Sequence, residues 1–323
     1  MPTITLARHA MATRFEIVLH GENPVALRAA GEEALAEIDR LESQLSLYLP
    51  TSEIAHLNAR AARQPVKVTP SLLGLLQHAQ KLHQETGGTF DITIAPLVRC
   101  WGFMGGTGRI PTPEEVAHAK SNVGMQHVLL NGEDFTVRFA REGVMIDLGA
   151  IGKGYAIDQA ADILREAGVR NALIHGGTST VLAMGRTPEG GPWKIAIENP
   201  LNQPAIQQTK QEEQIAPLVT IDLENEALSV SAVWGRCFEA GGKVFGHVLD
   251  PRTGQPTSNG VLAVVVLPSA TETDALSTAL LTMGEAGHEQ VSTLRHGMRT
   301  WLATRENGQI QLKSYTSGAR NSS

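Results

Sequence analysis

Cysteine is scarce in this sequence. Cys100 and Cys237 are the only two among 323 residues, so the chain carries neither a disulfide framework nor a cysteine-based metal motif. Two such thiols are compatible with a reducing compartment and do not establish one.

Basic and aromatic residues are also few. Lys and Arg together number 27 against 33 Asp and Glu, which gives a formal net charge of −6, and the chain has only 7 Phe and 3 Tyr. A nucleic-acid-binding protein needs a basic surface for the phosphates, and one that binds single strands needs aromatic rings on which bases stack. We therefore expect no nucleic-acid partner.

Long hydrophobic runs are missing as well. The apolar run at 261–267 has the length of a strand, whereas a membrane-spanning helix needs about 20 apolar residues. Residues 1–16 lack the basic start and continuous apolar core of a signal peptide. We expect no membrane span and a cytoplasmic protein as given, or a periplasmic one if the natural chain carries a leader ahead of these residues.

The residues that are present have the composition of an ordinary globular protein, with 42% hydrophobic and 19% charged side chains. The length suffices for a large single domain or two closely packed ones. Apolar periodicity predicts an early strand at 15–19 and helices over 26–45 and 72–82. Further strands are expected at 128–130, 135–139, 143–146, 172–175, 193–198, 218–223, 227–231, 243–249 and 261–267. The Gln-rich residues 201–216 indicate a solvated loop, and 317–323 a frayed tail.

A segment beginning at Thr271 combines a Thr cap, an acidic first turn and an apolar continuation, which predicts the start of a helix. Asp274 and Thr278 are four residues apart, so a helix places their carboxylate and hydroxyl on one face, one turn apart. Oxygen ligands at this spacing suit a small hard cation such as Mg2+. The same residue types commonly serve as helix caps, so the spacing alone leaves both interpretations open.

A second candidate stretch runs from Asp147 through a Gly-rich turn to Lys153 and a predicted helix. This order is typical of a phosphate site, because amides at a helix start attract anions and Lys adds a positive charge. The sequence does not match the P-loop motif, because Asp147 occupies the position of the first Gly of that motif and Gly154 occupies the position of its Ser or Thr. A phosphate site and a plain helix start both remain open.

Two single residues complete the candidates. Asp91 follows the double glycine 87–88, which allows close approach of a ligand to the backbone but is equally a common helix end. His247 precedes an Asp-Pro-Arg-Thr-Gly turn at 250–254. A lone His is more often a hydrogen-bonded structural residue, whereas beside phosphates and a metal it is a candidate general base.

Taken in order, these motifs closely resemble those of the ApbE family, the FAD:protein FMN transferases, over about residues 10–285. The segments that carry the resemblance are Met11-Ala-Thr13, 48–58, 87–103, 147–158, Gly176-Gly177, 247–254 and 274–278.

The resemblance implies an α+β fold of the ApbE type, similar to the T-fold, with mixed sheets and packed helices in a single domain over 1–323. FAD is expected in a cleft between two intertwined halves. The implied reaction is Mg2+-dependent transfer of the FMN moiety of FAD onto a Thr hydroxyl of an acceptor flavoprotein, with release of AMP.

The resemblance also assigns residues, position by position. Mg2+ is expected on Asp274, the Thr278 hydroxyl and the backbone carbonyl of Ala150, and His247 matches the proposed base of the family. The residues expected to line the FAD are Met11, Tyr48, Thr89, Phe90, Asp91, Asp147, Lys153 and His247.

The chain departs from the family pattern in two places. Relatives usually carry Ser-Gly-Asp-Tyr or similar after the late strand, whereas here Ser231 is followed by 232–235, Ala-Val-Trp-Gly, so we expect the pocket wall to differ. Many relatives are exported lipoproteins, yet no Cys precedes Cys100 here.

The same residues would serve a Mg2+-dependent FAD diphosphatase giving FMN and AMP, and a non-catalytic FAD-binding protein is a third possible function. The acceptor, the preferred metal and a homodimer are left open.

Overall fold

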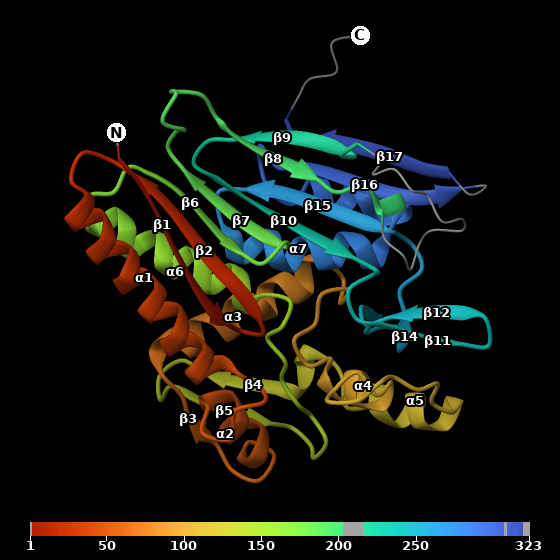
Figure 1. Ribbon diagram of the computed structural model, residues 1–323. Coiled ribbons are helices and arrows are strands. Elements are labelled where there is room, and N and C mark those ends of the chain that lie inside the picture. The colour runs from red at the N-terminus through yellow and green to blue at the C-terminus, as the bar shows by residue number, and fades with distance from the viewer. Residues whose placement is uncertain (1, 203–215, 307–308, 319–323) are drawn as a thin grey trace.

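An eight-stranded sheet with strand order β1-β2-β6-β7-β10-β15-β16-β17 is the centre of the protein (Figure 1). The computed structural model describes residues 2–202, 216–306 and 309–318. Every pairing in this sheet is antiparallel. Its strands are β1 (Thr3–Ala10), β2 (Thr13–His20), β6 (Asn171–Gly176), β7 (Thr180–Met184), β10 (Glu226–Ala232), β15 (Leu262–Leu267), β16 (Arg299–Glu306) and β17 (Gln309–Thr316). Most of the predicted loop 201–216, namely 203–215, and residues 319–323 of the predicted tail lie outside the described residues.

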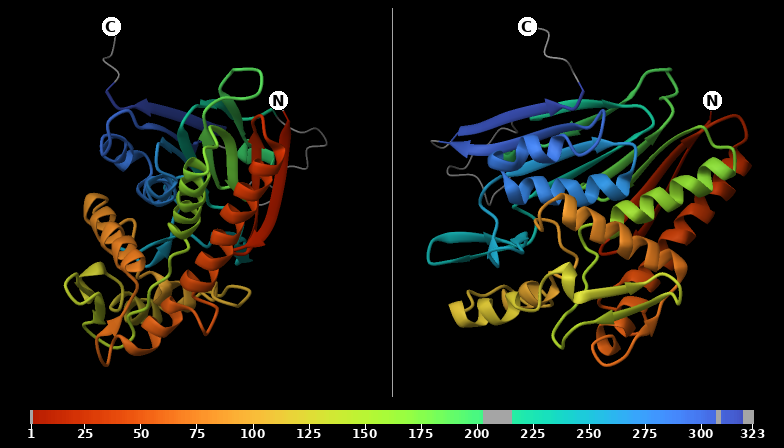
Figure 2. Two further views of the ribbon diagram at one scale, coloured as in Figure 1. Left: turned by 90° about the vertical axis from the view of Figure 1, so that its left-hand side faces the viewer. Right: turned by 180° about the vertical axis from the view of Figure 1, so that it is seen from behind.

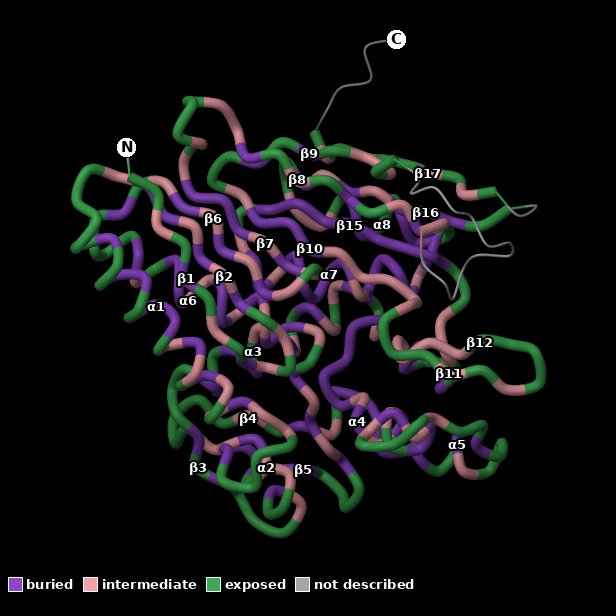
Figure 3. Tube along the Cα trace, in the orientation of Figure 1, coloured by how far each residue is buried: buried purple, intermediate pink, exposed green. Residues whose placement is uncertain are grey.

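Helices cover one face of this sheet and a two-stranded sheet covers part of the other (Figures 1 and 2). The helices are α1 (Pro24–Leu45), α6 (Gly152–Glu166) and α7 (Ala270–Met283), and the small sheet pairs β8 (Trp193–Ile197) with β9 (Val219–Leu223). β15 is therefore buried on both faces, as its apolar run predicts: alternate residues enter the core on the helix side and the core beneath β8 and β9. The tube in Figure 3 shows this burial at the sheet centre and the exposed edge at β17.

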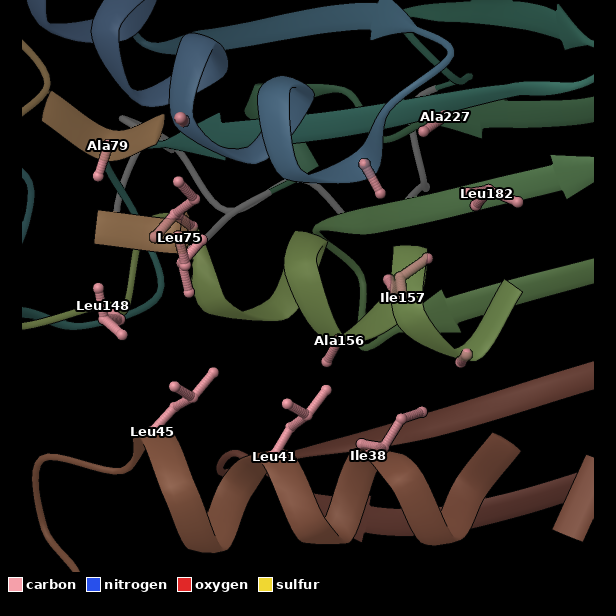
Figure 4. Close-up of a cluster of buried hydrophobic side chains, with 14 of the residues drawn as sticks. Ile38, Leu41, Leu45, Leu75, Ala79, Leu148, Ala156, Ile157, Leu182 and Ala227 are labelled. Atoms are coloured by element: carbon pink, nitrogen blue, oxygen red, sulfur yellow. The ribbon is translucent and has the colours of Figure 1, made fainter. Parts of the chain in front are cut away.

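The helix predicted over 26–45 is confirmed as α1, capped by the Asn23 side chain. Its apolar stripe repeats at the helical period and points toward α6 (Figure 4). Burying each Leu or Ile of this stripe contributes about 1.5–3 kcal/mol, which holds α6 between α1 and the sheet. The buried side chains labelled in Figure 4 include Ile38, Leu41 and Leu45 of α1, Ala156 and Ile157 of α6, Leu182 of β7 and Ala227 of β10, all members of one core cluster.

The remaining elements lie mainly below the helices in Figure 1. The predicted hairpin at 128–139 is confirmed as β4 and β5, which form a three-stranded sheet with β3. Within residues 2–202, 216–306 and 309–318, no helix combines the length and apolar composition that crossing a bilayer requires. These elements are α2 (Glu53–Arg60), β3 (Val66–Lys67), α3 (Pro70–Glu85), α4 (Ala95–Cys100), α5 (Pro113–Lys120), η1 (Met125–His127), β4 (Val128–Asn131), β5 (Thr136–Phe139), η2 (Pro200–Asn202), β11 (Cys237–Ala240), β12 (Lys243–Gly246), β13 (Leu249–Asp250), β14 (Gln255–Pro256), η3 (Glu285–Gly287) and α8 (His288–Ser292).

The β11–β12 hairpin is anchored by aromatic rings on the segment that follows α4. Trp101 lies 5.7 Å from Phe245 and Phe103 lies 5.6 Å from Phe238, measured between ring centroids, and the two hairpin rings stack at 5.2 Å. Rings at these separations attract one another beyond their apolar burial. These ring contacts hold in place β12, the strand that leads into His247.

The strand predicted at 143–146 is wrong, because Gly143 lies in a turn and 144–146 pair with no strand. The side chain of Asn58 takes the place of a neighbouring strand: it accepts from the Ile146 amide at 2.8 Å and donates to the Ile146 carbonyl at 2.9 Å. The next amide, that of Asp147, donates to the Ile92 carbonyl at 2.7 Å. A side chain 88 residues away in sequence thus satisfies a backbone that alternation alone assigned to a sheet.

Two boundaries also differ from expectation. The strand predicted at 243–249 divides into β12 and β13, because the chain changes its partner strand: Gly246 pairs with Cys237 of β11, whereas Leu249 pairs with Pro256 of β14. The helix expected to be capped by Thr271 begins at Ala270 with Ser269 as its cap.

Candidate functional site

The first turn of α6 lies directly against the first turns of α7. A Cβ placed on Gly154 would lie 2.1 Å from the Ala270 carbonyl oxygen and 2.9 Å from the Asp274 Cβ, so only glycine permits this approach. The Gly154 amide donates to Asp274 Oδ2 at 3.1 Å, and Lys153 Nζ lies 3.8 Å from Asp274 Oδ1. The junction brings together an ammonium group, a buried carboxylate and the amino terminus of a helix.

Asp158, further along α6, fixes α7 relative to α6. Its carboxylate accepts four hydrogen bonds, from Ser269 Oγ, the Ala270 amide and both the amide and hydroxyl of Thr271, at 2.6–2.9 Å. A negative charge at a helix amino terminus is stabilising because unpaired amides point toward it. The cap of α7 is therefore built partly by another helix, which is why the local pattern at Thr271 misplaced it.

The predicted metal ligands keep oxygen atoms available here. Asp274 is 5% exposed and Thr278, one turn along α7, is half-buried. Among the described residues none donates a hydrogen bond to the Ala150 carbonyl, because the Gly154 amide four residues later donates to Asp274 instead. A carboxylate, a hydroxyl and a backbone carbonyl are ligand types that Mg2+ accepts, so these residues fit the ion. The described part of the chain has no group of three or more His, Cys, Asp or Glu that could hold a metal ion, and the predicted ligand set includes only one carboxylate.

Asp147 shapes the turn that leads into α6. Its Oδ1 accepts from the Gly149 amide at 2.8 Å, and Lys153 Nζ donates to the Gly149 carbonyl at 3.2 Å. Burial raises the pKa of Asp147, whereas the Gly149 amide and the positive charges of Lys153 and Arg236 act against that rise. The positive charges of Lys153 and Arg236 therefore both favour the ionised form of the Asp147 carboxylate.

His247 is influenced by the same two cations. Its Nδ1 lies 3.1 Å from the Arg236 carbonyl oxygen, so Nδ1 carries the hydrogen and Nε2 is left as an acceptor. Burial lowers the pKa of His247, and the charges of Arg236 and Lys153 lower it further, against the effect of the Arg236 carbonyl. A neutral imidazole with an accepting Nε2 is the form that a general base requires.

Arg236 is a candidate site residue that the sequence pattern did not reveal. It lies on the exposed connection from β10 to β11, directly after residues 232–235, where the chain departs from the family pattern. A single Arg beside a glycine is typical of a solvated loop, so nothing local distinguished it. Its carbonyl orients His247 and its charge acts on both His247 and Asp147.

The loop after α3 lies beside the turn that leads into α6. The Ile92 carbonyl accepts from the Asp147 amide, which places this loop beside the turn into α6. Thr89 and Phe90 are each 1% exposed, and the Thr89 hydroxyl donates within the loop to the Thr86 carbonyl at 2.9 Å. A ligand would therefore meet these two residues through their backbone rather than their side chains.

Asp91, in the same loop, is held by internal partners. Its Oδ1 accepts from the amide and hydroxyl of Thr93 at 2.7 and 2.6 Å, and its Oδ2 lies 3.2 Å from His83 Nδ1. Burial alone would lower the pKa of His83, but the Asp91 carboxylate raises it on balance. This carboxylate serves the loop's own structure.

Met11 and Tyr48 lie at the carboxyl-terminal end of α1. The Met11 amide, in the β1–β2 turn, donates to Glu42 Oε1 at 2.7 Å, and Tyr48 is 58% exposed in the loop after α1. No hydrogen bond or ion pair among the described residues joins either of them to Lys153 or Asp274. The structure gathers the residues of α6, α7 and the 236–247 hairpin, and a place of Met11 and Tyr48 beside the FAD stays a prediction.

Comparison with known proteins gives a consistent result. The family model described as "ApbE family" matches residues 11–301. The FAD:protein FMN transferase of Vibrio cholerae is 33% identical over 257 residues, covering 77% of this chain and 73% of the relative. That of Haemophilus influenzae is 30% identical over 319 residues, covering 96% and 89%.

Solved structures agree on the fold. The ApbE protein of Thermotoga maritima superposes with a TM-score of 0.84 at 27% identity, covering 98% of this chain and 97% of that one. The Pseudomonas stutzeri flavinyl transferase ApbE, in its apo form, gives 0.82 at 28% identity, covering 98% and 95%. The expected α+β architecture is confirmed.

Proposed function

This chain belongs to the ApbE family, and on that premise we propose that it transfers the FMN moiety of FAD onto a Thr hydroxyl of an acceptor protein and releases AMP. The observation that carries the proposal is the junction of α6 and α7, where Lys153 and Asp274 meet. The relatives from Vibrio cholerae and Haemophilus influenzae bear the name of this activity.

The diphosphate of FAD is proposed to lie at the amino terminus of α6. Helix amides and the Lys153 ammonium group favour negative charge there. Asp274, Thr278 and the Ala150 carbonyl would hold Mg2+, which when bound neutralises charge on the diphosphate. Asp158 and Gly154 keep α6 and α7 at the separation this arrangement needs.

His247 is proposed to act as the general base. Its Nε2 accepts the proton of the acceptor Thr hydroxyl while that oxygen bonds to the phosphorus of the FMN half. The bond from this phosphorus to the bridging oxygen breaks, and AMP leaves with that oxygen and its electron pair. The lowered pKa of His247 keeps the imidazole neutral near pH 7.

Mass spectrometry of a Thr-containing acceptor incubated with this protein, FAD and Mg2+ tests the proposal. We expect the acceptor to gain the mass of FMN less one water, with AMP formed in equal amount. His247→Ala should lower the rate by about a hundredfold or more, because general-base catalysis contributes at least that factor. His118→Ala, on the exposed side of α5, is the matched control and should retain the parent rate.

Three outcomes would contradict the proposal. A His247→Ala rate within about tenfold of the parent, at equal FAD affinity, removes that residue as the base. Rapid AMP release from FAD and Mg2+ without any acceptor identifies a FAD diphosphatase instead. Recovery of intact FAD after incubation with Mg2+ and acceptor identifies a flavin-binding protein.

A further inference from the structure

We propose that Ser231 is a positioning residue for the metal site, which orients the Thr278 hydroxyl so that a lone pair of its oxygen faces the cation. The inference rests on the proposed function above, because it takes Thr278 as a metal ligand. It concerns a side chain from β10, a different element from those that carry the proposed ligands.

Ser231 lies where β10 packs against α7. Its Oγ is 3.1 Å from Thr278 Oγ1 and 2.8 Å from Ser277 Oγ. The two α7 hydroxyls also share a backbone acceptor, since Ser277 Oγ and Thr278 Oγ1 lie 3.1 and 3.2 Å from the Asp274 carbonyl oxygen. Three hydroxyls and one carbonyl therefore form a closed group around a proposed ligand.

The hydrogens of this group can be arranged in two ways. Each hydroxyl donates one hydrogen and can accept two. With no cation on Thr278, both α7 hydroxyls can donate to the Asp274 carbonyl, and the single Ser231 hydrogen is then shared between two neighbours. A hydroxyl whose oxygen binds a cation becomes a stronger donor and a weaker acceptor, because the cation draws on its lone pair.

The second arrangement resolves that competition. Thr278 donates to Ser231, Ser231 donates to Ser277, and Ser277 donates to the Asp274 carbonyl, so every hydrogen has its own acceptor at 2.8–3.1 Å. Only hydroxyl rotation is required, since the heavy atoms already stand at these distances. Turning the Thr278 hydrogen toward Ser231 fixes the direction of the remaining lone pairs.

Ser229 provides a matched control on the same strand. Two residues earlier, it lies on the same face of β10 and contacts α7 in the same way, with its Oγ 2.8 Å from Thr273 Oγ1 and 3.3 Å from Thr180 Oγ1. It touches no proposed ligand. Removing its hydroxyl perturbs the strand–helix contact without affecting Thr278, which separates positioning from packing.

Calorimetric titration of the full chain with Mn2+ alone, used as a probe for the divalent site, tests the inference. We expect Ser231→Ala to weaken Mn2+ binding by about tenfold, as loss of a group that orients a metal ligand does. Ser229→Ala should bind Mn2+ as the parent does, and Ser231→Thr, which keeps a hydroxyl, should restore most of the affinity. Thermal unfolding without metal should give a similar Tm for the two Ala variants.

Two further variants separate failure of the inference from failure of the metal site. Asp274→Asn and Thr278→Ala should each weaken Mn2+ binding strongly. If they do so while Ser231→Ala equals Ser229→Ala, the positioning role of Ser231 is refuted and the metal site stands. If the parent binds no Mn2+, or Asp274→Asn leaves binding unchanged, the metal site is refuted and the role of Ser231 with it.

Discussion

Gly154→Ala tests whether the close approach of α6 and α7 is essential. The new Cβ would stand 2.1 Å from the Ala270 carbonyl oxygen, so α7 must retreat by about 1 Å to restore an ordinary contact. Overpacking of this kind costs about 1–3 kcal/mol. The retreat also stretches the Gly154–Asp274 bond, now 3.1 Å, and losing a hydrogen bond to a buried carboxylate costs about 1.5–3 kcal/mol.

The two effects together predict that unfolding free energy falls by about 2.5–6 kcal/mol, a large share of the roughly 5–15 kcal/mol of a typical domain. Urea unfolding followed by circular dichroism measures the change. Gly74→Ala is the control, because Gly74 is also helical, in α3, and a Cβ there meets no atom within 4 Å. That variant should gain about 0.5–1 kcal/mol, since Ala loses less backbone entropy than Gly on folding.

Equal stability of Gly154→Ala and the parent would refute this reasoning, as would a shift of both glycine variants in the same direction. Divalent-ion binding by Gly154→Ala gives a second readout. Because the retreat of α7 carries Asp274 away from α6, Mn2+ affinity should fall even at temperatures where the variant remains folded.

Two other predictions concern pH and the cap of α7. The lowered pKa of His247 places the acid limb of the kcat/KM profile below the usual value of about 6.5, with activity lost as pH falls through it and the base becomes protonated. Arg236→Gln removes one of the charges that lower the pKa of His247 and should move this limb to higher pH; a limb at or above 6.5 in the parent would contradict the assignment. Asp158→Asn should lower unfolding free energy by about 1–3 kcal/mol, because an amide cannot accept all four hydrogen bonds. Asp162→Asn, which loses only an exposed pairing with Arg165, should change it by less than about 1 kcal/mol in the same urea experiment, and equal losses would refute the capping role.

Features that depend on neighbours in the chain were predictable from the sequence. The apolar stripe of α1 and the continuous run of β15 are local patterns, and both elements have the burial that those patterns predict. The spacing of Asp274 and Thr278 likewise fixes their shared face once α7 forms. The order of the motifs, also a property of the linear chain, was sufficient to indicate the ApbE family.

The tertiary structure alone decided how these pieces meet. The Gly154–Asp274 bond joins residues 120 apart, and the Asp158–Thr271 bond residues 113 apart. Neither could be inferred from local periodicity, because hydrogen bonds within a helix or turn link residues only a few positions apart. Arg236 and Ser231 likewise owe their proposed roles to packing, since a loop Arg and a strand Ser carry no local signal of the imidazole or hydroxyl that each one contacts.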